Sequence, residues 1–220
     1  MSKGDDSAGA GPLAGTCREL ARLGSATVYE AGGRGGYVDA DLVQVVPGAR
    51  AAGPARTVVC GQDDNLMVHA VMTGAQPGEV IVLTMPEPRP VALVGDLLAT
   101  QAQAAGAAAV LVDAAIRDIE ELAVMGLPIW TRWVRVKGAR KEAPGEINVP
   151  VTVGGARINP GDVVVLDSDG VAIVPAGRVS EVLEASLARE EKERVKRAKL
   201  QAGEKSYELD GLRAVVEGQR

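Results

Sequence analysis

The stretch "VALVGDLLATQAQAAGAAAVLVDAAIRD", residues Val91–Asp118, decides the fold of this chain. Small and apolar residues dominate it, and their pattern predicts a strand (Val91–Gly95), a helix (Leu97 to about Ala105) and a second strand (Ala108–Ala114). A strand, a crossover helix and a further strand form a βαβ unit, whose two strands lie parallel in one sheet. The stretch therefore predicts an α/β fold.

Charged residues in this stretch stand at the ends of the predicted strands. Asp96 follows the first strand, and Arg117 and Asp118 follow the second. Ligands of open α/β sheets bind outside the carboxyl ends of the strands. If the two strands are neighbours, the three side chains converge on one pocket. We interpret Asp113, at the end of the second strand, as structural.

The turn between the first strand and the helix has the features of an anion site. Gly95 permits a sharp turn, and the N–H groups of Asp96, Leu97 and Leu98 would lie unpaired at a helix N-terminus. Such a terminus attracts an anion, for instance a substrate carboxylate. Arg117 would add a planar, two-pronged donor for the same group.

Asp118, with Asp96 nearby, is a candidate ligand for a divalent cation. Carboxylates and water suit Mg²⁺ or Mn²⁺. The only histidine is His69, which excludes a histidine-rich zinc site. A metal, a guanidinium and exposed amides together would suit a 2-oxo acid, whose enolate they would stabilise.

Simpler interpretations of these residues stay open. Asp96 could be only a helix cap, and Arg117 with Asp118 only a surface ion pair. The segment Asp63–Asn65 fits a helix cap better than a metal site. His69 lies in a predicted helix, where a histidine is more often a satisfied core or interface residue than a catalyst.

Composition narrows the class of protein. The chain has 220 residues, 46% hydrophobic and none of them Phe, which suits one compact domain with a core of Val, Leu, Ile and Ala. A net charge of -5 argues against a nucleic-acid partner. Two cysteines are too few for a disulfide framework. We see no signal peptide and no run that would span a membrane, and we expect a cytoplasmic protein.

The rest of the chain predicts a flexible tail, a helix, several strands and a long final helix. The segments are residues 1–15 (tail), Cys17–Leu23 (helix), Ala55–Gly61 and Glu79–Met85 (strands), Pro128–Val136 (half-exposed strand), residues 147–175 (hairpins) and Val179–Gly203 (helix). We divide the chain into the tail, a domain over residues 16–178, and a C-terminal helix and tail over residues 179–220. The last part belongs to the same domain or to an oligomer interface.

The motif "GDLL" at Gly95–Leu98, followed one βαβ unit later by "RD" at Arg117–Asp118, resembles the signature of a known family. It is similar to the class II pyruvate aldolases that act on 4-hydroxy-4-methyl-2-oxoglutarate and 4-carboxy-4-hydroxy-2-oxoadipate, within the RraA-like superfamily. The resemblance covers about residues 16–215. It includes "ATVYEAGGRGG", "GQDDNLMVHA", "INVPVTVGGARINPGDVVVLDSDGVAIVP" and the charged helix ending "LQAGEKSYELDGLR".

The resemblance implies a fold, an assembly and an activity. It implies a single α/β RraA-like domain with a central β core flanked by helices, and a homotrimer or homohexamer in which the C-terminal helix packs on a neighbouring subunit. It implies a Mg²⁺- or Mn²⁺-dependent lyase of bacterial aromatic catabolism. That enzyme cleaves a 4-hydroxy-2-oxo acid to pyruvate plus oxaloacetate or pyruvate, and it decarboxylates oxaloacetate as a side activity.

The resemblance also implies roles for the residues of the motif. Asp118 would hold the metal, and Asp96 would assist through water. Arg117 would bind the pyruvyl oxygens, and the amides of Leu97 and Leu98 the carboxylate of the same substrate.

Two further residues are implied outside the motif. Lys141, in "ARKEAPGEINVP", would meet a distal carboxylate of the substrate. An acid of "REEKE" would come from the next subunit, and we choose Glu193 over Glu190 and Glu191.

Two rival functions use the same scaffold. The superfamily includes non-catalytic regulators that bind and inhibit a ribonuclease, and a scaffold of that kind has no need for Asp96, Arg117 and Asp118 together. The second rival is a dedicated oxaloacetate decarboxylase with the same pocket.

Overall fold

The structure is a computed structural model that describes residues 12–218 of the chain. Its helices are α1 (Pro12–Leu23), α2 (Ser25–Ala31), α3 (Leu66–Met72), α4 (Asp96–Ala104), α5 (Ile119–Met125), the 3-10 turn η1 (Ala176–Arg178), α6 (Val179–Gln201), α7 (Ser206–Leu209) and α8 (Leu212–Glu217). Its strands are β1 (Val43–Gln44), β2 (Ala51–Val59), β3 (Val80–Thr84), β4 (Ala92–Val94), β5 (Ala109–Ile116), β6 (Ile129–Val134), β7 (Glu146–Ile147), β8 (Val151–Val153), β9 (Ala156–Ile158), β10 (Val163–Asp167) and β11 (Gly170–Val174).

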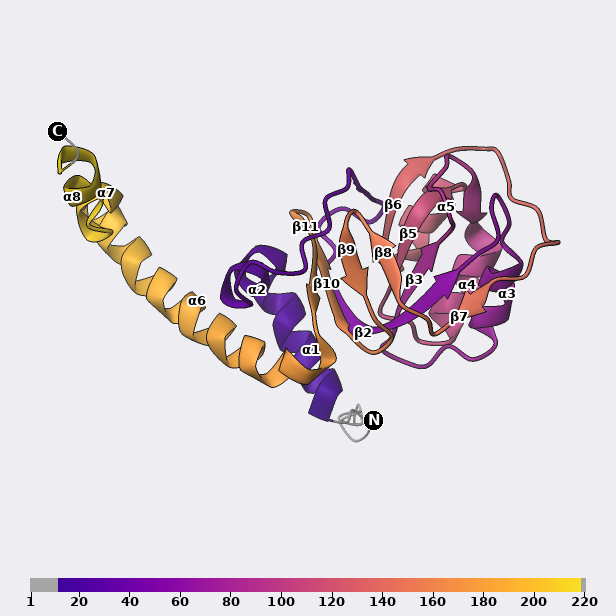
Figure 1. Cartoon of the computed structure of the whole chain (residues 1–220), viewed down its shortest axis with the longest axis horizontal. Helices are drawn as coiled ribbons and strands as arrows, with labels where there is room; N and C mark the ends of the chain where they lie inside the picture. Colours follow the sequence, from indigo (N-terminus) through magenta and orange to yellow (C-terminus); the bar gives the residue numbers. More distant parts are fainter. Residues whose placement is uncertain (1–11, 219–220) are drawn as a thin grey trace, which may run out of the picture.

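A mixed sheet forms the centre of the described residues. Its main order is β1-β6-β5-β3-β2-β10-β11, with β4 paired to β5 and β7 paired to β2 (Figure 1). Strands β2, β3, β5 and β6 run parallel, as do β4 and β5, whereas β1, β10 and β11 pair antiparallel. The carboxyl ends of β4 and β5 therefore lie side by side.

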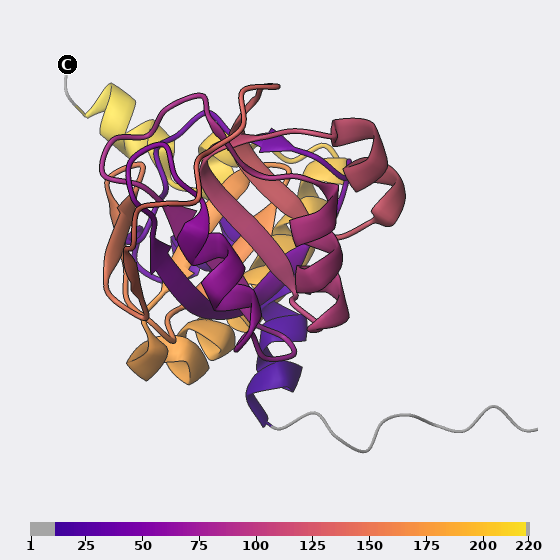
Figure 2. The ribbon, with the colours of Figure 1, turned by 90° about the vertical axis from the view of Figure 1, so that its right-hand side faces the viewer.

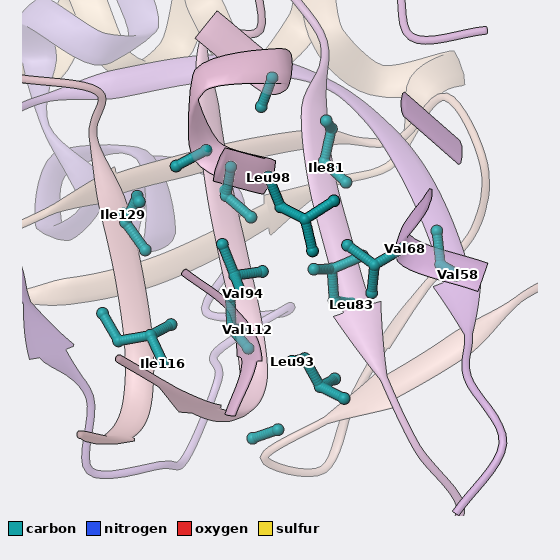
Figure 3. Packing of buried hydrophobic residues seen from close by; sticks show 14 of the residues in the cluster. Val58, Val68, Ile81, Leu83, Leu93, Val94, Leu98, Val112, Ile116 and Ile129 are labelled. Carbon is teal, nitrogen blue, oxygen red and sulfur yellow. The ribbon is translucent and has the colours of Figure 1, made fainter. Parts of the chain in front are cut away.

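Three helices cover one face of the parallel strands. Helices α3, α4 and α5 lie over the sheet when the molecule is viewed from the end opposite α6 (Figure 2). Apolar side chains of the helices, such as Val68 and Leu98, interlock with those of the strands, such as Leu83 and Val112 (Figure 3). Burial of this continuous apolar layer supplies the main driving force that fixes α4 against β4 and β5.

Two further hydrophobic clusters complete the core. On the other face of the sheet, Trp130 and Leu111 pack against the β8–β9 hairpin. Helices α1, α2 and the first part of α6 pack on β10 and β11. The remainder of α6 projects away from the sheet, so that α7 and α8 lie far from α3 and α4 (Figure 1).

The predicted α/β class, the βαβ unit over residues 91–116 and the long C-terminal helix are confirmed. Gly203 follows α6 with φ +97°, the backbone conformation that favours glycine after a helix. The prediction missed α2 and α5. It also began the first helix at Cys17, whereas α1 begins at Pro12; residues 1–11 of the predicted tail lie outside the described residues.

The strand predicted over Pro128–Val136 is present as β6, but its predicted alternation of buried and exposed residues was wrong. The first three residues of β6 are all buried, because Ile129 packs under the helices while Trp130 enters the cluster on the opposite face. The indole N–H of Trp130 donates to the carbonyl of Asp167 at 2.9 Å, which satisfies its only polar atom.

Across residues 12–218, no helix combines the length and the apolar character that crossing a bilayer requires.

Candidate active site

The ends of β4 and β5 bring the predicted residues together. β4 leads through Gly95 into α4, and β5 leads into Arg117 and Asp118. The backbone N–H of Asp96 donates to Oδ2 of Asp118 at 3.1 Å, which ties the start of α4 to the end of β5. The expected convergence of Asp96, Arg117 and Asp118 is therefore present within one chain.

Gly95 is required at this junction because there is no room for a side chain. A Cβ atom at this position would collide with Oδ2 of Asp118 and would lie 3.2 Å from Nε of Arg117. Gly95 has an extended backbone with φ −131°, so its role is close approach and not an unusual conformation.

Asp118 adopts the left-handed conformation, with φ 61° and ψ 42°. A non-glycine residue pays on the order of 1 kcal/mol or more for this conformation, and such residues cluster at functional sites. The bend places the carboxylate of Asp118 back against the N-terminus of α4 instead of along the continuing chain.

A cavity of about 160 Å³ lies at this junction. Its lining combines the turn after β4, Arg117, the start of α3 and the loop after β6; the residues are Asn65, His69, Ala92, Leu93, Val94, Gly95, Asp96, Leu97, Leu98, Arg117, Gly138, Ala139 and Lys141. Volume alone does not identify the site, since a larger cavity of about 360 Å³ lies between α2 and β11. That larger cavity contains none of the predicted site residues.

One wall of the pocket presents unpaired donors. Within residues 12–218 the backbone N–H groups of Leu97 and Leu98 have no acceptor, as expected in the first turn of α4. The side chain of Arg117 is 52% exposed, and its ion pair with Asp118 is long, at 3.6 Å. An exposed pair of this length is weak, so the guanidinium can bind a ligand oxygen without breaking a strong contact.

Lys141 also lines the cavity, on a loop that is held in place by backbone contacts. The carboxylate of Asp64 accepts hydrogen bonds from the N–H groups of Glu142 (2.7 Å), Ala143 (3.0 Å) and Leu66 (2.8 Å). Burial raises the pKa of Asp64, but these three donors and nearby Arg140 outweigh it, and the pKa lies below its ordinary value. Asp64 thus joins the start of α3 to the loop that carries Lys141.

Sequence reasoning missed two polar residues of this pocket, Asn65 and His69. His69 is not the satisfied histidine that we expected, because its Nε2 is buried and has no hydrogen-bond partner within residues 12–218. Burial lowers the pKa of His69, and the nearby charge of Lys141 lowers it further, so the imidazole is neutral at pH 7. The available signal was the spacing of Asn65 and His69, which at i,i+4 share one helix face.

Two carboxylates stand at this junction as candidate ligands for a divalent cation. Asp96 lines the cavity, whereas Asp118 is not among its lining residues and is tied to its edge through the N–H of Asp96. Among the described residues, no three His, Cys, Asp or Glu side chains come together as a complete metal site. Asp118 nevertheless fits as an anchor, because only its Oδ2 is engaged by the N–H of Asp96 and the carboxylate of Asp96 is close by in the same turn. One or two carboxylates, with water and substrate oxygens as the other ligands, form the kind of site that Mg²⁺ prefers.

Two acids that were considered in the sequence lie outside the pocket. Glu193 is on α6, where its carboxylate pairs with Nε of Arg189 at 2.8 Å, and it is not among the residues that line the cavity. The projecting part of α6 lies away from α3 and α4 (Figure 1). Asp113 is buried and bonded to Arg132, consistent with the structural role expected for it.

Comparison with known proteins gives one family. The sequence pattern of the RraA-like family, described as Aldolase/RraA, matches residues 24–173. A relative from Halalkalibacterium halodurans, named "Putative 4-hydroxy-4-methyl-2-oxoglutarate aldolase", is 39% identical over 138 residues. That match spans 63% of this chain and 66%, just under two thirds, of the relative's own length.

Solved structures give the same fold. Streptomyces coelicolor RraAS2, described as an unusual member of the RNase ES inhibitor RraA protein family, is 30% identical with a TM-score of 0.73. The match covers 90% of this chain and 98% of that one. The RNA-processing inhibitor RraA from Thermus thermophilis is 32% identical with a TM-score of 0.57, over 61% of this chain and 81% of that one.

Proposed function

The chain belongs to the RraA-like family, and on that premise we propose that it is a divalent-metal-dependent class II aldolase. Its proposed substrates are 4-carboxy-4-hydroxy-2-oxoadipate and 4-hydroxy-4-methyl-2-oxoglutarate, which it cleaves to pyruvate plus oxaloacetate or pyruvate. Decarboxylation of oxaloacetate is the proposed side activity, because it passes through the same pyruvate enolate.

The observation that carries this proposal is the composition of one small pocket. Gly95, the amides of Leu97 and Leu98, Arg117 and Lys141 line a single cavity. The donors come from separate segments, the ends of β4 and β5 and the loop after β6, which suits a substrate with a carboxylate at each end. A family relative named for this aldolase activity supports the same choice of substrate.

The residues of the pocket have separate tasks in the cleavage. The amides of Leu97 and Leu98 bind the carboxylate next to the keto group, and Lys141 binds the distal carboxylate. A water molecule is our candidate for the base that removes the proton of the C4 hydroxyl. The C3–C4 bond then breaks, and its electron pair forms the enolate of pyruvate.

Arg117 stabilises that enolate. Its guanidinium carries a fixed positive charge close to where negative charge accumulates in the transition state, which is the most effective place for a charged donor. A proton from water at C3 then completes pyruvate. No buried lysine acts as a nucleophile, so no Schiff base is formed.

Mg²⁺ or Mn²⁺ is the proposed cofactor, with Asp118 as its anchor and Asp96 assisting through water. When bound, such a cation acts as a Lewis acid toward the oxygens of a 2-oxo acid. The hydrogen bond from the N–H of Asp96 leaves Oδ1 of Asp118 without a partner within the described residues. That oxygen is the one we assign to the cation.

The site is proposed to be completed by Glu193 of a neighbouring subunit in a homotrimer or homohexamer. Glu190 is engaged by Arg22 through two hydrogen bonds of 2.7 and 2.8 Å, and Glu191 is engaged by Arg194. Glu190 and Glu191 each use both carboxylate oxygens, whereas Glu193 meets Arg189 through one oxygen, at 2.8 Å. This arrangement favours Glu193 as the acid that exchanges partners on assembly.

The test is a coupled lactate dehydrogenase assay for pyruvate with both proposed substrates. We expect EDTA to abolish pyruvate release and added Mg²⁺ or Mn²⁺ to restore it. Arg117→Ala should lower kcat by about a hundredfold or more, the typical cost of losing one group that stabilises transition-state charge. The matched control is Arg135→Ala, because the exposed guanidinium of Arg135 bonds to the carbonyl of its neighbour Val134 and does not line the cavity.

Several outcomes would overturn this proposal. Full activity of Arg117→Ala would exclude the role of Arg117 in stabilising the enolate. Insensitivity to EDTA would exclude the metal-dependent mechanism. Trapping of the substrate by borohydride would reveal a Schiff base and a different class of aldolase.

A second candidate function rests on the likeness to Streptomyces coelicolor RraAS2, which spans 90% of this chain. In that case the chain is a non-catalytic regulator of a ribonuclease. Tight binding of an endoribonuclease by a protein that releases no pyruvate would favour it. Turnover of oxaloacetate without turnover of either 4-hydroxy acid would instead indicate a dedicated oxaloacetate decarboxylase.

A further inference from the structure

We propose that Asn65 and His69 form a subsite that recognises the C4 hydroxyl group of the substrate. The inference rests on the proposed aldolase function and deepens it, because it says which residues distinguish a 4-hydroxy-2-oxo acid from a simple 2-oxo acid. Both residues lie in the stretch "GQDDNLMVHA", which is part of the family resemblance, but the resemblance assigned no role to either of them.

The orientation of the Asn65 amide is fixed by the protein. Its Nδ2 donates to the carbonyl of Leu93 at 3.0 Å, so Oδ1 is the atom that remains. Oδ1 is buried without a partner within residues 12–218, and the residue is only 8% exposed. Because Asn65 lines the cavity, we assign the missing donor to a ligand bound there.

An amide oxygen accepts hydrogen bonds and cannot donate them. An ionised carboxylate or a keto group therefore cannot form a hydrogen bond with Oδ1 of Asn65, whereas a hydroxyl group can donate one. Among the functional groups of a 4-hydroxy-2-oxo acid, the C4 hydroxyl alone is a donor when the carboxyl groups are ionised. The unpaired acceptor thus selects the group that separates this substrate class from pyruvate and oxaloacetate.

His69 stands one helical turn after Asn65 on α3 and lines the same cavity. Its Nε2 is the second buried polar atom here without a partner among the described residues. Buried polar atoms without hydrogen-bond partners destabilise the folded protein. A ligand oxygen that bonds to both atoms would supply the missing partners. The C4 oxygen, which has one proton and two lone pairs, can serve Asn65 and His69 at once.

The position of the pair agrees with the path of the substrate. The amides of Leu97 and Leu98 and the guanidinium of Arg117 hold the pyruvyl end, and Lys141 holds the distal end. Asn65 and His69 stand on α3, beside the loop that carries Lys141. A hydroxyl at C4 lies between the two ends of the substrate, where this pair meets it.

The experiment compares two reactions of one enzyme in the presence of Mg²⁺. The first is cleavage of 4-carboxy-4-hydroxy-2-oxoadipate. The second is exchange of the methyl protons of pyruvate in D₂O, which needs the enolate but involves no C4 hydroxyl. His69→Leu and Asn65→Leu should lower kcat/KM for cleavage roughly tenfold or more, the equivalent of one lost hydrogen bond, and lower exchange much less.

Conservative and control variants keep the test decisive if Asn65→Leu fails to fold. His69→Gln retains a polar atom of similar reach and should recover part of the cleavage that His69→Leu loses. Thr73→Ala lies at the end of the same helix, outside the pocket, and should change neither reaction. Thermal melting of each variant separates loss of the fold from loss of the subsite.

The outcomes divide clearly. Equal losses of cleavage and exchange, or no loss at all in His69→Leu, would overturn the subsite. A wild-type protein that neither cleaves the substrate nor exchanges pyruvate would instead overturn the proposed function itself, before any variant is compared.

Discussion

Gly95 shows how closely the pocket is built around one missing side chain. A Cβ at this position would meet both the carboxylate of Asp118 and the side chain of Arg117. The glycine leaves Asp118 near the N-terminus of α4, where the backbone N–H of Asp96 holds it at 3.1 Å. Gly95 was predicted from the sequence for its turn, but its second role, clearance for Asp118, depends on the pairing of β4 with β5.

We predict that Gly95→Ala weakens metal binding and activity together. The new methyl group would push Oδ2 of Asp118 away from the N–H of Asp96, so the carboxylate would lose its fixed position. Titration of the protein with Mn²⁺ should show a weaker site, and pyruvate release should fall at least tenfold, as for other displaced supporting contacts of metal ligands.

Gly177→Ala is the matched control, because a Cβ at Gly177 meets nothing within 4 Å. It should bind Mn²⁺ and release pyruvate as the wild type does. If Gly95→Ala binds Mn²⁺ as tightly as this control, Asp118 is not the anchor of the cation.

The place of Asn65 and His69 in the pocket could not be predicted from the sequence. Their sequence, with i,i+4 spacing on a predicted helix, equally fits a buried core face. Only the loop after β6, which folds back over α3, turns that face into the wall of a pocket. The two segments are about 75 residues apart, and the residue pattern of neither segment predicts the contact between them.

At the scale of elements, the loop that carries Lys141 is tied to its neighbours on both sides. The N–H of Ala92 donates to the carbonyl of Lys137 at 2.7 Å, so one end of the loop lies along β4. The N–H of Asn65 donates to the carbonyl of Arg140 at 2.9 Å, so the other end lies on α3. The buried carboxylate of Asp64 closes this arrangement with its three backbone donors.

We predict that Asp64 contributes to stability in a pH-dependent way. Its pKa in the folded protein lies below the ordinary value of 3.8, so the ionised form is favoured by folding. The contribution is complete above about pH 5 and is lost as the pH falls below 4 toward the folded pKa. Urea unfolding of the wild type and Asp64→Asn should therefore differ by about 1–3 kcal/mol at pH 7 and converge in acid.

The exposed Asp169 provides the control, since Asp169→Asn removes one carboxylate without touching the loop. A difference between the wild type and Asp64→Asn that stays constant from pH 7 to pH 3 would contradict the role of the ionised carboxylate.

At the scale of the whole molecule, the projecting part of α6 has the surface expected of a contact with another subunit. Several apolar residues on α6 and α8 are exposed in the single chain, among them Leu187, Val195 and Leu212. Exposed apolar surface on a projecting helix is typical of an assembly interface. The proposed trimer or hexamer would cover these residues and bring Glu193 to a neighbouring pocket.

A mixture of inactive subunits tests the shared site. Arg117→Ala and Glu193→Ala should each be nearly inactive alone. In a cyclic oligomer assembled from equal amounts of both, about a quarter of the sites would combine an intact Arg117 with an intact neighbouring Glu193. Co-expression should therefore restore activity, measured as pyruvate release.

The mixture of Arg117→Ala with Asp118→Asn is the control, because both residues belong to the same side of each site and no intact pocket can form. Restoration in this control, or its absence in the first mixture, would show that Glu193 does not complete the site of a neighbour.

The sequence predicted the parallel strands and their crossover helix better than the rest of the fold. The apolar strands and the Gly95 turn carry strong local signals, and the structure confirms the βαβ unit that they predict. The short helix α5 was missed because it follows Asp118 directly, and the left-handed backbone of that residue has no distinct sequence signal. The partner of α6 depends on surfaces that one chain does not contain.

The most direct measurement of the central claim is a calorimetric titration with oxalate, a stable dianion that resembles the enolate of pyruvate. If the amides of Leu97 and Leu98, Arg117 and a cation held by Asp118 surround one small oxo acid, oxalate should bind tightly when Mg²⁺ is present. Removal of Mg²⁺, or the substitution Arg117→Ala, should abolish that binding. Oxalate that fails to bind the folded wild type with Mg²⁺, or that binds Arg117→Ala equally well, would contradict the account.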